Sequence, residues 1–375
     1  MIGGRETLLV ATLSVLLVAC GPSGTASPAV GSPVPTASAT PVDSAATPAS
    51  SPTATLAATA PASPPPTPTA TISGPSYDNP VYARDFPDPF VLSAGGTYYA
   101  YSTNSGIFNV PVLQSTDLAS WERVGDAMTV LPEWSRVGHT WAPGVIQIGD
   151  RFVLYFTARH AESGRQCIGV AVADAPVGQF SSAADEPLIC QLDLGGSIDP
   201  YPFRDTDGTL HLYWKNDGNC CGLDVFLWGQ RLSDDGLTLL GGPVQLLERD
   251  QAWERPLIEN PAMVEHDGGY YLFYSGNRWD SVDYAVGYGT CETALGPCQK
   301  PRNEPILTHQ PESTGPGGQA FFHDEEGNLW MAYHAWTGIR VNYPAGERSL
   351  RLEPVSFEGG EPVVEGPTTD PQPMP

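Results

Sequence analysis

Alternating aromatic and aliphatic residues recur five times along the chain, each time directly after a glycine. The five copies span residues 96–102, 149–157, 208–215, 269–275 and 327–334. Their glycines are spaced about 53 to 61 residues apart, the interval expected when one small sheet is repeated around a ring. The pattern predicts an all-β fold, a five-bladed β-propeller in which each copy is one strand of a blade.

A second pattern precedes each glycine by roughly seven to ten residues. Its copies are Pro87-Asp88-Pro89-Phe90, Trp141-Ala142-Pro143-Gly144, Ile198-Asp199-Pro200-Tyr201, Glu259-Asn260-Pro261-Ala262 and Gly317-Gly318-Gln319-Ala320. If the glycine marks the turn into the second strand, these segments are the first strands, which line the central channel of a propeller. Three of the five carry a carboxylate in step with the repeat: Asp88, Asp199 and Glu259.

The first 19 residues have the pattern of an export signal. Arg5 precedes an apolar run, Leu8 to Val18, that is too short for a membrane span. The run ends in Leu17-Val18-Ala19-Cys20, which resembles the lipobox of bacterial lipoproteins and implies lipidation of Cys20. An ordinary secretory signal is the alternative. Residues 20–76, rich in Ala, Ser, Thr and Pro, predict a disordered tether, so we expect an extracellular protein anchored to the membrane by lipid.

The remaining chain is long enough for one domain. We place that domain at residues 77–366 and a short disordered tail at 367–375. With 42 acidic and 18 basic residues, the net charge of -24 repels phosphate backbones and anionic lipid headgroups. Nucleic acid is therefore not an expected partner. We expect a monomer that binds a neutral substrate and meets the membrane only through its lipid.

If Cys20 carries lipid, six of the seven cysteines remain, and export permits disulfides among them. Six cysteines allow fifteen connectivities, and the sequence does not choose among them. We expect two local bridges, Cys291 with Cys298 and Cys167 with Cys190. The adjacent Cys220 and Cys221 would then form a vicinal bridge or stay free. A zinc site is the alternative, although no Cys-x-x-Cys pair or histidine cluster supports it.

Three carboxylates brought to one cavity suit glycosidic bond cleavage. This reaction needs a proton donor for the leaving oxygen and a carboxylate that activates water on the opposite face of the sugar. Crowding three carboxylates in a partly desolvated funnel raises the pKa of at least one, which can then serve as an acid at neutral pH. Each residue alone has a structural explanation, since Asp-Pro commonly opens turns. Their joint placement favours the catalytic interpretation.

From about Asn79 to Gly366 the chain resembles family 43 glycoside hydrolases, five-bladed propellers that cleave arabinose- and xylose-containing plant polysaccharides with inversion. The resemblance is carried by residues 85–89, 115–121, 141–143, 197–200 and 259–261. It implies that Asp88 is the general base and Glu259 the general acid. Asp199 would hold the acid in place and tune its pKa.

The resemblance also suggests substrate contacts. Trp141 would line the pocket beside the sugar, and Arg340 or Arg351 would contact sugar hydroxyls or stabilise Asp88. Trp279 stands in a polar loop and is our candidate for a rim contact, although a tryptophan more often belongs to the core.

Many relatives carry a Gly-Pro-Gly-His segment in the fifth blade, whose histidine helps to hold a calcium or sodium ion. Here the segment reads Gly315-Pro316-Gly317-Gly318-Gln319. We therefore expect no required cofactor, with Gln319 offering an amide oxygen to Ca²⁺ or Na⁺ as the alternative. His334 either faces the channel or is a buried histidine with a backbone partner.

The expected activity is that of an α-L-arabinofuranosidase. It is placed ahead of endo-arabinanase and β-xylosidase because the chain has no counterpart of the extra sandwich domain of many β-xylosidases of this kind. A non-catalytic glycan-binding propeller is a second alternative, but such a site has no need of three carboxylates. A third is a sucrose- or fructan-acting enzyme, whose retaining chemistry needs a nucleophilic Asp close to the acid.

Overall fold

The structure is a computed structural model that describes residues 74–374 except 183, 338 and 339. All described residues fall within one compact unit spanning 68–375. The predicted signal peptide, Cys20 and nearly all of the predicted tether lie outside the described residues. Within the described part, no helix combines the length and apolar character needed to cross a membrane.

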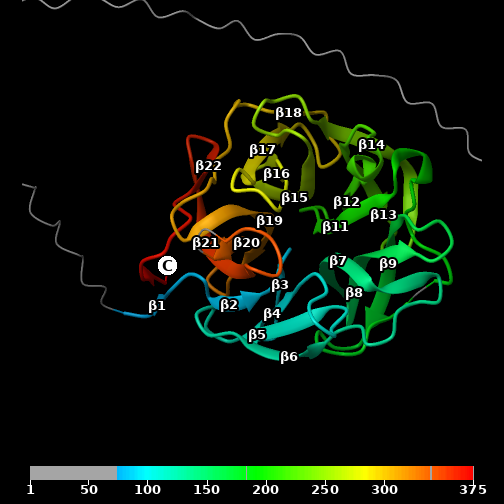
Figure 1. Cartoon of the computed structure of the whole chain (residues 1–375), viewed down its shortest axis with the longest axis horizontal. Helices are drawn as coiled ribbons and strands as arrows, with labels where there is room; N and C mark the ends of the chain where they lie inside the picture. The colour runs from blue at the N-terminus through cyan, green and yellow to red at the C-terminus, as the bar shows by residue number, and fades with distance from the viewer. Residues whose placement is uncertain (1–73, 183, 338–339, 375) are drawn as a thin grey trace, which may run out of the picture. The chain divides into compact units, whose positions relative to one another are not determined.

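Five antiparallel sheets surround a common axis, one for each predicted blade (Figure 1). Blade one contains β3 (Phe90–Ala94), β4 (Thr97–Tyr101), β5 (Pro111–Ser115) and β6 (Glu122–Asp126). Blade two contains β7 (Ser135–Ile148), β8 (Arg151–His160), β9 (Gln166–Ala173) and β10 (Ser181–Ser182). Blade three contains β11 (Ser197–Arg204), β12 (Leu210–Asn216), β13 (Phe226–Leu232) and β14 (Leu239–Glu248).

The last two blades follow the same order. Blade four contains β15 (Ile258–His266), β16 (Gly269–Gly276), β17 (Ala285–Cys291) and β18 (Cys298–Gln299). Blade five contains β19 (Ser313–His323), β20 (Leu329–Thr337), β21 (Arg348–Glu358) and β2 (Tyr82–Asp85), and β22 (Glu361–Val364) pairs with β21. Two 3-10 turns accompany blade three: η1 (Leu192–Leu194) precedes it, and η2 (Gly218–Cys221) connects its strands β12 and β13.

The five first strands meet around the axis. Each of β3, β7, β11, β15 and β19 contacts the first strands of the blades before and after it, which closes a ring. The glycine-led motifs form β4, β8, β12, β16 and β20, the second strand of every blade. The predicted five-bladed propeller and the assignment of its strands are therefore confirmed.

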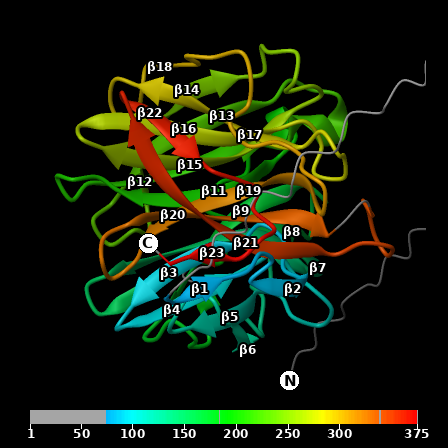
Figure 2. The ribbon, with the colours of Figure 1, turned by 90° about the vertical axis from the view of Figure 1, so that its left-hand side faces the viewer.

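The ring is closed by a strand from the start of the domain. β2 pairs with β21 in the last blade (Figure 2). At its end, Asp85 accepts hydrogen bonds from the Arg348 backbone N–H (3.1 Å) and the Tyr343 hydroxyl (2.6 Å). The next residue, Phe86, donates its own N–H to the Arg348 carbonyl at 2.7 Å. Strands from the two ends of the domain thus share one sheet.

The C-terminal residues differ from the expected disordered tail. β23 (Gln372–Pro373) pairs with β1 (Ser76–Tyr77), and Thr368 donates two hydrogen bonds to the buried carboxyl group of Glu353. A buried carboxylate needs donors, so this contact holds the segment against the fifth blade.

All six cysteines after residue 100 are bridged. The disulfides join Cys167 to Cys190, Cys291 to Cys298 and the adjacent Cys220 to Cys221. The two expected local bridges are confirmed, and the third pair takes the vicinal form. Cys291 and Cys298 are also partners across the β17–β18 ladder.

Chemical labelling should verify these bridges. Protein that is denatured without a reductant should expose no reactive thiol among its last six cysteines, because each sulfur is already bonded to another. Maleimide labelling followed by peptide mapping should detect all six only after reduction. A label on Cys220 or Cys221 before reduction would contradict the vicinal bridge.

Candidate functional site

In every blade one residue turns the backbone into the left-handed region, within the first strand in blades two to five and two residues before β3 in blade one. These kinked residues and their φ angles are Asp88 (50°), Ala142 (40°), Asp199 (59°), Asn260 (51°) and Gly318 (62°). In blades two to five the kink lies in a register shift against the second strand. A bulge of this kind leaves a residue outside the ladder and re-aims its side chain. In four blades the next residue is proline, which has no N–H to leave unpaired.

The kinked segments converge on the axis. All five kinked residues line one cavity of about 20 Å³, together with their neighbours Pro89, Pro143, Pro200, Pro261 and Gln319. The predicted convergence of the repeated segments on a common channel is thus observed.

Each kink is tied to the blade before it by a hydrogen bond from its backbone N–H to a side chain. The donor and acceptor pairs are Asp88 to His334 Nδ1 (3.0 Å), Ala142 to Thr103 Oγ1 (2.9 Å), Asp199 to Thr157 Oγ1 (3.1 Å), Asn260 to Asp199 Oδ2 (3.1 Å) and Gly318 to Ser275 Oγ (2.9 Å). We call these five bonds the kink ring.

The acceptor occupies the same position in four of the five blades. It is the second-strand residue that pairs with the residue just before the kink of its own blade, and it accepts the kink N–H of the following blade. Blade three is the exception. In blade three that position is Lys215, whose ammonium has no lone pair. The Asp199 carboxylate accepts the Asn260 N–H instead, and the Lys215 Nζ lies 3.1 Å from Glu259 Oε2.

Glu259 lies one residue before the kink of its blade, whereas Asp88 and Asp199 are themselves the kinked residues. Glu259 is therefore offset by one position from the two aspartates, in line with the sequence, where Asn260 separates it from the proline that directly follows Asp88 and Asp199. The second carboxyl oxygen of Glu259 accepts a hydrogen bond from the Tyr284 hydroxyl at 3.0 Å. Glu259, Lys215 and Tyr284 are all buried.

The pKa values of Asp199, Asp217 and Tyr284, which lie near Lys215 and Glu259, are raised. Burial, followed by the charge of Glu259, raises the pKa of Asp199 well above its usual value. Burial also raises the pKa of Asp217 to about 6, against the opposing charge of Lys215. Burial and the charge of Glu259 raise the pKa of Tyr284, so its hydroxyl stays a donor. The expectation that crowding raises the pKa of at least one carboxyl group is met by Asp199.

Asp88 is half-buried, and its charge acts on both Asp199 and Tyr284. Its Oδ2 accepts a hydrogen bond from Thr103 at 2.6 Å, and Arg348 Nη1 lies 3.7 Å from Oδ1. Burial and the charge of Arg348 lower the pKa of His334 well below its usual value, so the ring is neutral. Because His334 Nδ1 accepts the Asp88 N–H, its Nε2 carries the proton.

Arg348, rather than either arginine suggested by the sequence, lies beside Asp88. Its guanidinium carbon is 4.5 Å from the Trp279 ring and also lies over Trp336 and Tyr343. Arg351 is fully buried and donates to the Glu312 carbonyl, and Arg340 is exposed in a loop. No sequence signal distinguishes Arg348, because three aromatic residues from separate segments hold it.

The predicted aromatic contacts take different positions. Trp141 is half-buried directly before the Ala142 kink, with its ring 6.2 Å from that of His139. Trp279 is half-buried, and the guanidinium of Arg348 lies over its ring. Substrate contact by Trp141, Trp279 and Arg340 stays a prediction.

The fifth-blade segment offers a poor cation site. Gln319 Oε1 accepts a hydrogen bond from Ser275, and Gln319 Nε2 donates to the Asn260 carbonyl. His334 Nε2 is a proton donor rather than a metal ligand in its neutral form. In the described part of the chain, no three His, Cys, Asp or Glu side chains are grouped to hold a metal ion.

Comparison with known proteins identifies the family. Residues 77–362 match the sequence model of glycosyl hydrolases family 43. The chain belongs to this family. A thermostable family 43 glycoside hydrolase of known crystal structure is 32% identical, with a TM-score of 0.73 over 80% of this chain and 99% of that one.

Relatives of the chain carry several names. The extracellular exo-α-(1→5)-L-arabinofuranosidase ArbA of Cellvibrio japonicus is 29% identical over 57% of this chain and 66% of its own length. A probable arabinan endo-1,5-α-L-arabinosidase B of Aspergillus flavus is 24% identical over 74% of this chain and 88% of its own length. The protein is accordingly a glycosidase that hydrolyses O-glycosyl bonds.

Gly318 offers a test of how tightly this family 43 site is packed. A Cβ at this position would lie 2.5 Å from the His334 ring and 2.8 Å from Asp88 Oδ1. Gly318→Ala should displace Asp88 and lower kcat about a hundredfold, since shifts near 1 Å have effects of that order. The control is Gly327→Ala, where φ is also positive but no atom lies within 4 Å of the new Cβ. Equal activity of the two variants in an assay of sugar release would contradict this account.

Proposed function

We propose that this enzyme is an extracellular α-L-arabinofuranosidase that removes arabinose from plant cell-wall polysaccharides with inversion. Endo-arabinanase and β-xylosidase activities are the alternatives within the same chemistry. The observation that carries the proposal is that two carboxylates at the channel have different cationic partners. Arg348 lies 3.7 Å from Asp88, whereas Lys215 lies 3.1 Å from Glu259, which also accepts a hydrogen bond from Tyr284.

This division supports one role for each carboxyl group. Asp88 would accept the proton of the attacking water, since its side chain is 15% exposed to solvent and its neighbours fix its orientation. Glu259 would protonate the leaving oxygen. Asp199 would position this acid, because it accepts the N–H of Asn260, the residue next to Glu259.

The names of the relatives favour arabinose over other sugars. ArbA is named an exo-arabinofuranosidase, and the relative from Aspergillus flavus is named an arabinan endo-arabinosidase. A putative β-xylosidase of Xylanibacter ruminicola, 24% identical over 76% of this chain, keeps xylose as the alternative.

Product analysis separates the alternatives. The enzyme should release arabinose from linear arabinan or arabinoxylan, seen as reducing sugar and sized by chromatography. Larger products would favour the endo-acting alternative, and xylose from xylan the xylosidase. Binding without turnover would favour a glycan-binding propeller.

Substitution of the three carboxyl groups should produce three different phenotypes. Glu259→Gln should lower cleavage of polysaccharide by about 10²–10⁴-fold, yet keep much of the activity on an aryl glycoside whose phenol leaves without protonation. Asp88→Asn should lose both activities, because every substrate needs the water to be activated. Asp199→Asn should fall between them. Steady-state kinetics on the two substrate types measures the difference.

Two outcomes would contradict this assignment. NMR of the first product should show the inverted anomer, and a retained anomer would favour the fructan-type alternative. The Asp88 and Glu259 carboxyl groups should be separated by about 6.5 to 9.5 Å in a crystal structure with bound sugar, which leaves room for the water. A separation near about 5 Å would indicate a retaining enzyme.

The membrane anchor is a separate part of the proposal. Cys20 ends an apolar run with the lipobox pattern, so its sulfur should carry diacylglycerol in the bacterial host. Radiolabelled palmitate should enter the wild-type protein and not the Cys20→Ala variant. Release of the unmodified wild type into the medium would contradict the anchor.

A further inference from the structure

The edge of the site between blades two and three, which we call the rim, carries charged side chains that have no part in the catalytic roles proposed above. Asp217 follows β12 two residues after Lys215, so it stands at the same end of blade three as Glu259's partner. Its carboxyl group is buried and interacts electrostatically with Lys215, Glu259, Arg165 and Arg159. Within the described residues, no hydrogen bond reaches this carboxyl group.

Arg159 faces the Asp217 carboxyl group from blade two. Side chains two apart in a strand point to the same side, and the Thr157 hydroxyl on β8 accepts the Asp199 N–H from blade three. Arg159 is therefore on the side of β8 that faces blade three. Its Nε is buried and has no hydrogen-bond partner in the described part of the chain. Opposite charges thus face each other across the rim, and no ion pair there joins Arg159 to Asp217.

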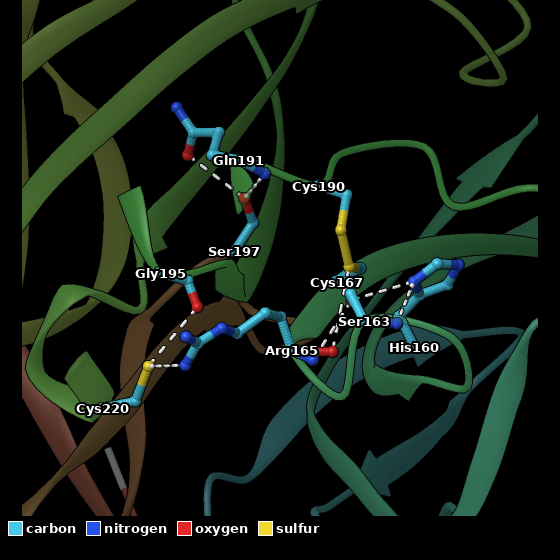
Figure 3. Close-up of a disulfide and its surroundings, with 9 residues drawn as sticks. All are labelled: His160, Ser163, Arg165, Cys167, Cys190, Gln191, Gly195, Ser197 and Cys220. Carbon is cyan, nitrogen blue, oxygen red and sulfur yellow. Dashed lines mark hydrogen bonds between the residues drawn. A yellow bond between two sulfur atoms is a disulfide. The ribbon is translucent and has the colours of Figure 1, made fainter. Parts of the chain in front are cut away.

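The vicinal disulfide forms the outer edge of this rim. η2 ends in Cys220 and Cys221, and Cys220 lies 3.5 Å from the Gly195 carbonyl beside η1. The side chain of Arg165 reaches from blade two to the same sulfur, at 3.3 Å (Figure 3).

The loop that carries this disulfide is held closely. A Cβ on Gly195 would lie 2.4 Å from the Asp217 carbonyl, and the Asp217 N–H donates to the Gly196 carbonyl at 3.0 Å. Cys220 is nevertheless exposed to solvent. The edge is therefore fixed in place, and Cys220 is accessible from solvent.

We propose that Arg159, Asp217 and the Cys220–Cys221 disulfide form the subsite for the sugar on the leaving-group side of the scissile bond. This inference rests on the proposed function. The subsite lies next to Glu259, the group that would protonate the leaving oxygen.

The chemistry of the rim fits a pentose or hexose unit with free hydroxyl groups. A hydroxyl between the two charges would accept from the Arg159 guanidinium and donate to the Asp217 carboxyl group, which satisfies both. The polarisable sulfurs would contact the C–H face of the ring. A phenol in the same place offers no such hydroxyls.

The test compares two substrates of the full-length enzyme, an arabino-oligosaccharide and a nitrophenyl arabinofuranoside. Asp217→Asn keeps the side-chain shape and should lower the ratio of kcat/KM, oligosaccharide over aryl glycoside, about tenfold through a higher KM for the oligosaccharide. A fall in kcat for the oligosaccharide at unchanged KM would instead indicate an effect on Glu259 and would overturn the subsite. Arg159→Met and the double variant Cys220→Ala/Cys221→Ala should lower the same ratio. Circular dichroism and thermal melting verify that each variant is folded, and Asp217→Asn decides the matter if another does not fold.

Two controls match these changes. Asp224→Asn removes an exposed carboxylate from the same loop, and Cys291→Ala/Cys298→Ala removes a disulfide at the far end of blade four. Both should leave the ratio unchanged. If the wild type cleaves both substrates and Asp217→Asn leaves the ratio as it is, the subsite is overturned while the proposed function stands. If the wild type cleaves neither, the proposed function fails and the subsite with it.

Discussion

The kink ring is the constraint on which the site depends. Four residues with side chains adopt a left-handed backbone, a conformation that costs roughly 1–2 kcal/mol for each. A hydrogen bond from each kinked N–H to the preceding blade offsets a similar amount, about 0.5–1.5 kcal/mol. The same bonds join every blade to its neighbour at the axis. The geometry that aims Asp88 and Asp199 is therefore also the geometry that holds the blades together.

Lys215 connects the kink ring to the candidate catalytic groups. Replacing a hydroxyl acceptor by an ammonium forces Asp199 to accept the N–H of the next blade and leaves the ammonium for Glu259. One buried cation then lies near Glu259, Asp199 and Asp217. Burial raises the pKa values of the two aspartates, the charge of Glu259 raises them further, and the charge of Lys215 opposes the shift.

Closure of the propeller and support of Asp88 come from one short segment. Asp85 fixes the backbone of Arg348 and the Tyr343 hydroxyl while β2 completes the last blade, and three residues later Asp88 meets the Arg348 side chain. Loss of β2 would therefore remove the closing contact together with Asp85, which fixes the arginine beside Asp88.

The sequence alone determined the blade count and the second-strand motifs, and it favoured two of the disulfides, because these depend on local periodicity and short separations. It also indicated which carboxylates lie near the channel. Only the tertiary structure decided that the kink of blade four falls on Asn260, that Lys215 is the partner of Glu259 and that Arg348 rather than Arg340 lies beside Asp88. Those contacts join different blades, and no spacing along one chain reports which side chains meet across a ring.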